Sequence, residues 1–146
     1  MNCPMCHRWT EQLDLRIAEL EHCYLTLNRD QFFPGYCLLF TKDHVTELFH
    51  LTPQVRQGVI EEVNRVAKAL FELYQPTKIN YELLGNMVPH MHWHLVPRRS
   101  DDLLWPRPIW SEPHQEQALT EEGYRHAATA IRRAMGLSET AREQTP

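Results

Sequence analysis

The 146-residue chain has no apolar run of the roughly 20 residues that a membrane-spanning helix requires. Its N-terminal segment, MNCPMCHRWTEQ, has no apolar core of the kind found in a secretory signal. It also has no surplus of basic residues, because 15 Lys and Arg stand against 19 Asp and Glu and leave a formal net charge of −4. These absences exclude a general binder of nucleic acid or of anionic membranes, and they predict a cytoplasmic protein.

Cysteine is scarce, with four residues in the chain. In a cytoplasmic protein these are thiols or metal ligands rather than disulfides. Cys23 and Cys37 alternate with apolar neighbours, which predicts that they belong to the core. Cys3 and Cys6 form a Cys-x-x-Cys pair in the segment 1–12, which we expect to be a loop.

The remaining pattern predicts an α+β domain in which the helices are segregated around a mostly antiparallel sheet. Thr52 and Pro53 are typical of a helix start, and an apolar stripe follows as far as Tyr74. A last helix is expected from Thr120 to about Met135, where Gly136 ends it. Strand patterns occur in 16–28 (two short strands), 35–42, 78–85 and 90–97. We expect an extended arm at 98–119, a single domain over 1–136 and a disordered tail at 137–146.

Three histidines alternate with apolar residues in the segment HMHWHLVP. On a strand, this spacing places His90, His92 and His94 on one face of the sheet. The outer two Cα atoms would lie about 13 Å apart, too far for all three rings to hold one metal ion unless the strand folds back. A neutral imidazole can attack phosphorus, and its neighbours can hold phosphoryl oxygens or protonate the leaving group. The alternative is a solvated face without chemistry.

HMHWHLVP resembles the histidine triad (HIT) signature, His-φ-His-φ-His-φ-φ, at every position. Pro34-Gly35 before an apolar strand, followed by Lys42 and His44, is similar to a second segment of that family. The resemblance covers about residues 3–97. The chain is therefore identified as a member of the HIT family, of the bacterial nucleotide hydrolase or transferase type.

The resemblance implies a HIT-like fold with a five-stranded, mostly antiparallel sheet, one long central helix and a C-terminal helix, usually in a homodimer. It implies a nucleoside-phosphate hydrolase or nucleotidyl transferase that acts at an α-phosphate through a covalent nucleotidyl-histidine. The substrates would be dinucleoside polyphosphates or adenylyl compounds. By the same resemblance, His92 is the nucleophile, His94 contacts the phosphate and assists the leaving group, and His90 is an orienting residue or a zinc ligand.

The resemblance also gives the N-terminal cysteine pair a role. Zinc-bearing members combine such a pair with the histidine of the Lys-x-His segment and the first triad histidine. The matching residues are Cys3, Cys6, His44 and His90, a standard set for a structural zinc ion. Spacing alone leaves other histidines, such as His7 and His50, as competitors for the third place, and it leaves open that the cysteines are unligated thiols.

The sequence departs from the family pattern at several positions. Asn86 stands where a Gln is common, Met87 where some branches carry a Ser, and Tyr36 where many members have a His. Asn28 matches a ribose-binding Asn in the dinucleoside polyphosphate branch, or else is a turn residue. Arg98 either reaches the phosphate or lies on a solvated edge. The missing Ser favours an alternative function, a nucleotide-binding protein with little or no turnover.

Overall fold

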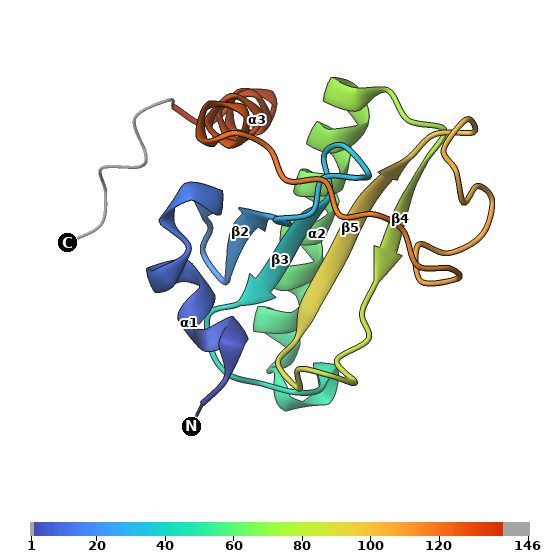
Figure 1. The fold of residues 1–146 in the computed structure, drawn as a ribbon. Helices are drawn as coiled ribbons and strands as arrows, with labels where there is room; N and C mark the ends of the chain where they lie inside the picture. The colour runs from blue at the N-terminus through green and yellow to red at the C-terminus, as the bar shows by residue number, and fades with distance from the viewer. Residues whose placement is uncertain (1, 139–146) are drawn as a thin grey trace.

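The computed structural model describes residues 2–138 (Figure 1). Most of the predicted C-terminal tail, residues 139–146, lies outside the described residues, and the predicted single domain over 1–136 stays a prediction. The elements, in chain order, are α1 Pro4–Glu11, η1 Leu13–Leu15, β1 Arg16–Glu19, β2 Cys23–Leu27, β3 Cys37–Thr41, η2 Leu48–His50, α2 Pro53–Tyr74, β4 Lys78–Glu82, β5 His92–Arg98 and α3 Glu121–Ala134. None of the helices in residues 2–138 is long and apolar enough to cross a membrane.

The five strands form one sheet in the order β1-β2-β3-β5-β4, and every neighbouring pair is antiparallel. The long helix α2 crosses one face of this sheet, behind the strands in Figure 1. Its buried side chains form one core with the side chains of that face, including Trp93 and Leu95 of β5. The predicted α+β fold with a five-stranded sheet and a long central helix is confirmed.

Helix α2 begins and ends where the sequence predicts. The side chain of Thr52 accepts a hydrogen bond from the backbone N–H of Val55 at 3.3 Å, and Pro53 occupies the first turn. The helix ends at Tyr74, because Gln75 adopts a left-handed conformation with φ of 49° and Pro76 follows. The apolar stripe is buried against the sheet from Val59 to Leu70, whereas Leu73 near the end of the helix is exposed.

The N-terminal segment corrects one expectation. Residues 4–11 are a helix and not the predicted loop. Pro4 suits the first turn, and Met5 and Trp9, four residues apart, are buried on one side. The Trp9 ring stacks on Tyr24 of β2 at 4.5 Å between centroids. The proline at the helix start and the spacing of Met5 and Trp9 are the sequence signals of this helix.

The predicted arm at 98–119 packs against its own domain. Leu104 and Ile109 are buried in a second hydrophobic cluster, on the face of the sheet opposite α2. Helix α1 contributes to the same cluster through Met5 and Trp9. In Figure 1 the arm loops out beside β4 and then returns across the front of the sheet to α3. Helix α1 and this arm therefore border the face that carries the triad histidines.

Candidate active site

His92 and His94 lie at the start of β5, and His90 lies in the chain just before this strand. His92 pairs with Phe40 and His94 with Leu38 of β3, so both rings share the face opposite α2. His90 corrects the expectation of three histidines on one strand, because β5 begins at His92. The backbone N–H of His90 donates to the carbonyl of Val88 at 2.8 Å, which bends the chain just before the strand.

His92 has its proton fixed on one ring nitrogen. Its Nδ1 lies 2.6 Å from the backbone carbonyl oxygen of His90. A carbonyl oxygen only accepts hydrogen bonds, so Nδ1 carries the hydrogen and Nε2 keeps a free lone pair. No described residue bonds to that Nε2. Among residues 2–138, Gln12 Oε1 is the one side-chain nitrogen or oxygen atom that is both buried and without a hydrogen-bond partner. Since His92 Nε2 also has no partner, it is not buried and reaches solvent.

His94 lies beside His92, with 4.9 Å between ring centroids. Its Nδ1 is 2.6 Å from the Tyr36 hydroxyl, and the ring edge meets Trp110 at 5.3 Å. The Trp110 indole N–H in turn donates to Glu82 at 2.6 Å. Burial lowers the pKa of His94 to about 4, and the charges of His92 and Arg8 add to this shift. His94 is therefore a neutral imidazole at neutral pH.

Arg8 is a site residue that the sequence reasoning missed, because it lies in the segment expected to be a loop. Its guanidinium donates to the Thr26 hydroxyl at 2.9 Å and to the Leu27 carbonyl at 2.8 Å, both on β2. Burial, followed by the charge of Arg29, lowers the pKa of Arg8 to about 10, so it remains a cation at neutral pH. Helix α1 thus brings one positive charge close to the face where an anionic phosphate would bind.

Next to the triad, Cys3, Cys6, His44 and His90 converge from three segments of the chain. Their potential ligand atoms all lie within 4.8 Å of one another. Cys3 Sγ is 3.6 Å and Cys6 Sγ 3.5 Å from His90 Nδ1, and Cys6 Sγ is 3.3 Å from His44 Nδ1. A tetrahedral zinc ion with ordinary bond lengths separates sulfur from nitrogen by about 3.5 Å. The donor set and its spacing therefore fit zinc.

The state of His90 also suits a metal ligand. Its Nε2 lies 2.7 Å from the backbone carbonyl of Thr41, so Nε2 carries the hydrogen and the Nδ1 lone pair faces the two sulfurs. Burial lowers the pKa of His90, which favours the neutral ring that binds metal. The competitors His7 and His50 do not belong to the cluster. The sequence-predicted set of four is the set that the fold brings together.

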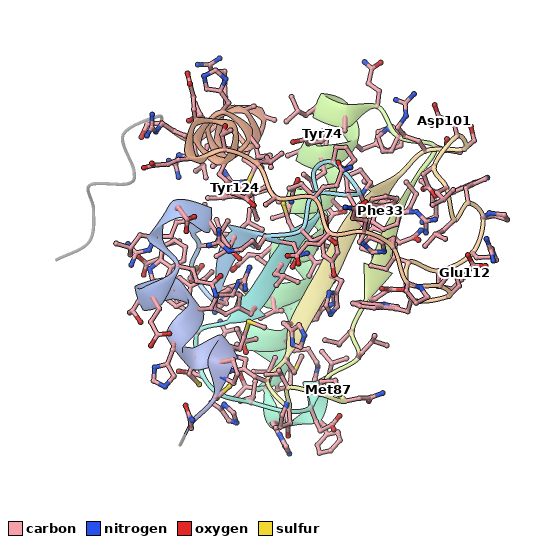
Figure 2. All side chains as sticks on the ribbon, in the orientation of Figure 1. Phe33, Tyr74, Met87, Asp101, Glu112 and Tyr124 are labelled. Carbon is pink, nitrogen blue, oxygen red and sulfur yellow. The ribbon has the colours of Figure 1, made fainter. Side chains whose placement is uncertain are left out.

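The predicted substrate residues lie in different surroundings. Asn28 donates from its side chain to the carbonyl of Asp30 at 3.1 Å, inside the turn after β2. Asn86 is exposed and lines a cavity of about 390 Å³ that also borders His90. Met87, where some family branches carry a Ser, is 93% exposed and lies at the lower end of the molecule in Figure 2.

Arg98 corrects an expectation, because it offers no free donor to a phosphate. It is 1% exposed, and its Nε and Nη2 atoms donate to the carboxylate of Asp102 at 2.7 and 3.0 Å. Its Nη1 donates to Asn80 at 2.9 Å. The alternation of the strand turns this side chain inward, where the ion pair joins β5 to the start of the arm.

Comparison with known proteins identifies the family. The pattern of the HIT domain matches residues 10–101, more than half of the chain, so the chain belongs to the HIT domain family. A histidine triad (HIT) protein from Sinorhizobium meliloti is similar in structure, with a TM-score of 0.77 and 31% identity over 82% of this chain and 88% of that one. A zinc-bound histidine triad family protein from Mycobacterium smegmatis gives a TM-score of 0.66 and 25% identity over 93% and 94%.

Two relatives from Schizosaccharomyces pombe are named as enzymes. An adenosine 5'-monophosphoramidase is 28% identical over 94 residues, which are 60% of this chain and 69% of that protein. An asymmetrical bis(5'-nucleosyl)-tetraphosphatase is 25% identical over 91 residues, 59% of this chain and 50% of that protein. The predicted HIT membership is confirmed, and the chain is classed with enzymes. Cys3, Cys6 and Arg8 precede the matched segment, so the family match does not cover them.

Proposed function

We propose that the protein is a nucleoside-phosphate hydrolase or nucleotidyl transferase that acts at an α-phosphate, with His92 as the nucleophile. The observation that carries this proposal is the fixed proton on His92 Nδ1, held by the His90 carbonyl at 2.6 Å. It leaves Nε2 as a solvent-accessible lone pair beside a second imidazole. Such a nitrogen attacks phosphorus without first losing a proton.

The reaction would proceed in two displacements. In the first, the Nε2 lone pair of His92 forms a bond to the α-phosphorus while the bond to the leaving group breaks, and the leaving group keeps the bonding electrons. The nucleotidyl-imidazole is positively charged, and the His90 carbonyl that accepts from Nδ1–H stabilises it. In the second, water attacks phosphorus while the bond from phosphorus to Nε2 breaks, so that Nε2 recovers its lone pair and the proton of the water passes to solvent. His94 would contact a phosphoryl oxygen and assist the leaving group, and Arg8 would stabilise the negative charge.

We further propose that Cys3, Cys6, His44 and His90 hold a structural zinc ion. When bound, zinc would supply a rigid cross-link, since all four ligands come from the protein and no coordination position is left for substrate. The cysteine pair, with Cys3 at the N-cap and Cys6 in the first turn of α1, would be tied to the loop after β3 and to the bend before β5. This link would hold α1, and with it Arg8, against the face that carries His92 and His94.

The substrate class is proposed from the two relatives named above. One is named for an adenosine phosphoramidate and the other for a dinucleoside tetraphosphate, so both kinds of nucleotide are candidates. Asn28 and Asn86 remain proposed substrate contacts. Asn28 lies in a turn, where its side-chain oxygen is available to a ribose hydroxyl while its nitrogen donates to Asp30.

A panel of leaving groups tests the proposed function. The purified protein is assayed with diadenosine tetraphosphate, adenosine 5'-phosphoramidate and their guanosine counterparts, and release of nucleoside monophosphate is measured. Turnover of at least one compound is expected. Tight binding of nucleotides, by calorimetry, without any turnover would contradict the enzyme proposal and favour the nucleotide-binding alternative.

A homodimer in the cytoplasm also stays a proposal. The homodimer is supported by strand β4 at the edge of the sheet, which pairs with β5 alone among the strands in residues 2–138. Beside this edge, Tyr81 is 51% and Phe71 50% exposed, and both line a groove of about 360 Å³. An edge strand next to exposed aromatic residues favours pairing with a second copy. Light scattering at micromolar concentration tests it, with twice the mass of 17.3 kDa expected.

A further inference from the structure

Tyr36 occupies a position where many HIT family members have a histidine, and the proposed reaction gives it no role. Its ring is 5% exposed and its hydroxyl lies 2.6 Å from His94 Nδ1. His94 Nδ1 is the one hydrogen-bond partner of this hydroxyl among residues 2–138. Two arrangements are possible for a neutral pair: the phenol donates to Nδ1, or Nδ1–H donates to the phenol oxygen.

The surroundings favour the first arrangement. Burial, followed by the charges of Glu82 and Asp30, raises the pKa of Tyr36, so the phenol keeps its hydrogen at neutral pH. A buried hydroxyl hydrogen needs an acceptor, and His94 Nδ1 is the acceptor within reach. If Nδ1 carried the hydrogen instead, the phenol hydrogen would be left unpaired in the interior. A phenol is also the better donor and an imidazole lone pair the better acceptor of the two groups.

We propose that Tyr36 is a positioning residue that fixes His94 in the tautomer with hydrogen on Nε2, so that His94 presents a hydrogen-bond donor to the phosphate bound by His92. The neighbouring rings then have opposite functions, set by their Nδ1 partners. A carbonyl oxygen accepts from His92 Nδ1 and leaves a lone pair on Nε2, whereas a phenol donates to His94 Nδ1 and leaves a hydrogen on Nε2. A lone pair attacks phosphorus, and an N–H stabilises the oxygen charge that the attack creates.

The role is a hydrogen bond and not a proton transfer. If His94 gave up its Nε2 hydrogen, Tyr36 would have to protonate Nδ1 and become a buried phenolate, which the burial of this ring disfavours. The His94 ring also contacts Trp110 at 5.3 Å between centroids, and the Trp110 indole N–H donates to Glu82. Contacts with both Tyr36 and Trp110 thus hold the ring, while Nε2 reaches solvent.

The catalytic part of this inference, a donor to the phosphate, rests on the proposed function. The structural part, the tautomer of His94, is tested without any substrate. In ¹⁵N-labelled protein at pH 7.5, long-range ¹H–¹⁵N spectra distinguish protonated from unprotonated ring nitrogens. We expect hydrogen on Nε2 of His94 and on Nδ1 of His92. A wild-type spectrum with hydrogen on His94 Nδ1 would overturn the proposal, and it requires no variant to fold.

Tyr36→Phe removes the hydroxyl and keeps the ring. The variant should shift His94 toward a mixture of tautomers, leave His92 unchanged, and lower kcat about tenfold while KM changes less than about twofold. Tyr74→Phe is the matched control, since its ring packs on the adjacent Gly35 and its hydroxyl has no hydrogen bond to any described residue. It should match the wild type in spectrum and rate. An unchanged His94 spectrum in Tyr36→Phe would refute the positioning role.

The two proposals fail in different ways. If the wild type turns over no nucleotide but shows hydrogen on His94 Nε2, the proposed function fails and the tautomer assignment stands. If the wild type is active and Tyr36→Phe keeps full kcat with an altered tautomer, the donor is not used by the reaction and the catalytic part of this inference is wrong.

Discussion

His90 and His92 stand two residues apart, and a backbone carbonyl fixes the proton of each ring, yet the two rings serve different regions. The Thr41 carbonyl takes the Nε2 hydrogen of His90, so the remaining lone pair on Nδ1 faces Cys3 and Cys6. The His90 carbonyl takes the Nδ1 hydrogen of His92, so the remaining lone pair on Nε2 faces no described side chain. The ring nitrogen that donates to a carbonyl thus differs between the two histidines, as the proposed roles of His90 as a zinc ligand and His92 as a nucleophile require.

The largest expected effect is on turnover at the site around His92. His92→Ala should lower turnover at least about a thousandfold, because it removes the nitrogen proposed to form the covalent intermediate. The fold and nucleotide affinity should be largely kept, as measured by thermal unfolding and calorimetry. His126→Ala, on the exposed side of α3, is the control. More than one per cent of wild-type activity in His92→Ala would contradict the assignment.

The second effect is on metal binding and stability at the cluster of cysteines and histidines beside the triad. Cys3→Ser should reduce bound zinc well below one per chain and lower the melting temperature by about 10 °C, because the cross-link between α1 and the triad segment is lost. Metal analysis and thermal unfolding of protein purified without chelator measure both. His7→Ala is the matched control on the same helix, since His7 lies outside the cluster. No zinc in the wild type, together with an unchanged melting temperature in Cys3→Ser, would mean that the cysteine pair is vestigial.

A third effect is the pH dependence of the free energy of unfolding that His94 contributes. The pKa of His94 is about 4 in the folded protein and about 6.5 when unfolded, so the unfolded chain binds more protons between these values. The stability that His94 contributes is therefore complete above pH 6.5 and is lost as the pH falls toward 4. The loss is of the order of 3 kcal/mol.

Urea unfolding of the wild type and of His94→Gln, at intervals from pH 7.5 to 4.5, measures this contribution. The zinc ligands are common to both proteins, so the difference between the two curves isolates His94. We expect the wild type to lose more stability on acidification than the variant. Parallel curves would contradict the burial of a neutral His94.

The smallest effect concerns the reaction after metal removal. His92 and His94 are not ligands in the cluster, so chelated protein assayed well below its melting temperature should keep kcat within about threefold. Zinc should be removed more easily as the pH falls, since protons compete with zinc for the thiolates. Loss of turnover that is restored by zinc, in protein that is still folded, would contradict this prediction and show that the reaction depends on the metal cluster.

Much of the fold could be predicted because local signals agreed with the tertiary structure. Thr52, Pro53 and the apolar stripe defined α2, and the alternation around Cys23 and Cys37 placed both in the core. Helix α1 was missed because the eight residues from Pro4 to Glu11 give a short pattern, stabilised by the stacking of Trp9 on Tyr24, a contact between distant segments.

The site was predictable where a motif carried it and not where tertiary contacts did. The resemblance gave His44 and His90 as companions of the cysteine pair, and the fold brings the four together. No sequence pattern gives the hydrogen bond between Tyr36 and His94 or the burial of Arg98 beside Asp102, because each depends on side chains that meet only after folding.

The covalent intermediate tests the central claim most directly. Protein mixed with an adenylyl substrate that is turned over is quenched within milliseconds under alkaline conditions, and the labelled peptide is sequenced by mass spectrometry. We predict one adenylyl group per chain, attached to His92, with His90 and His94 unmodified. An adduct on any other residue, or steady turnover without an adduct in a quench fast enough to capture one, would contradict the account.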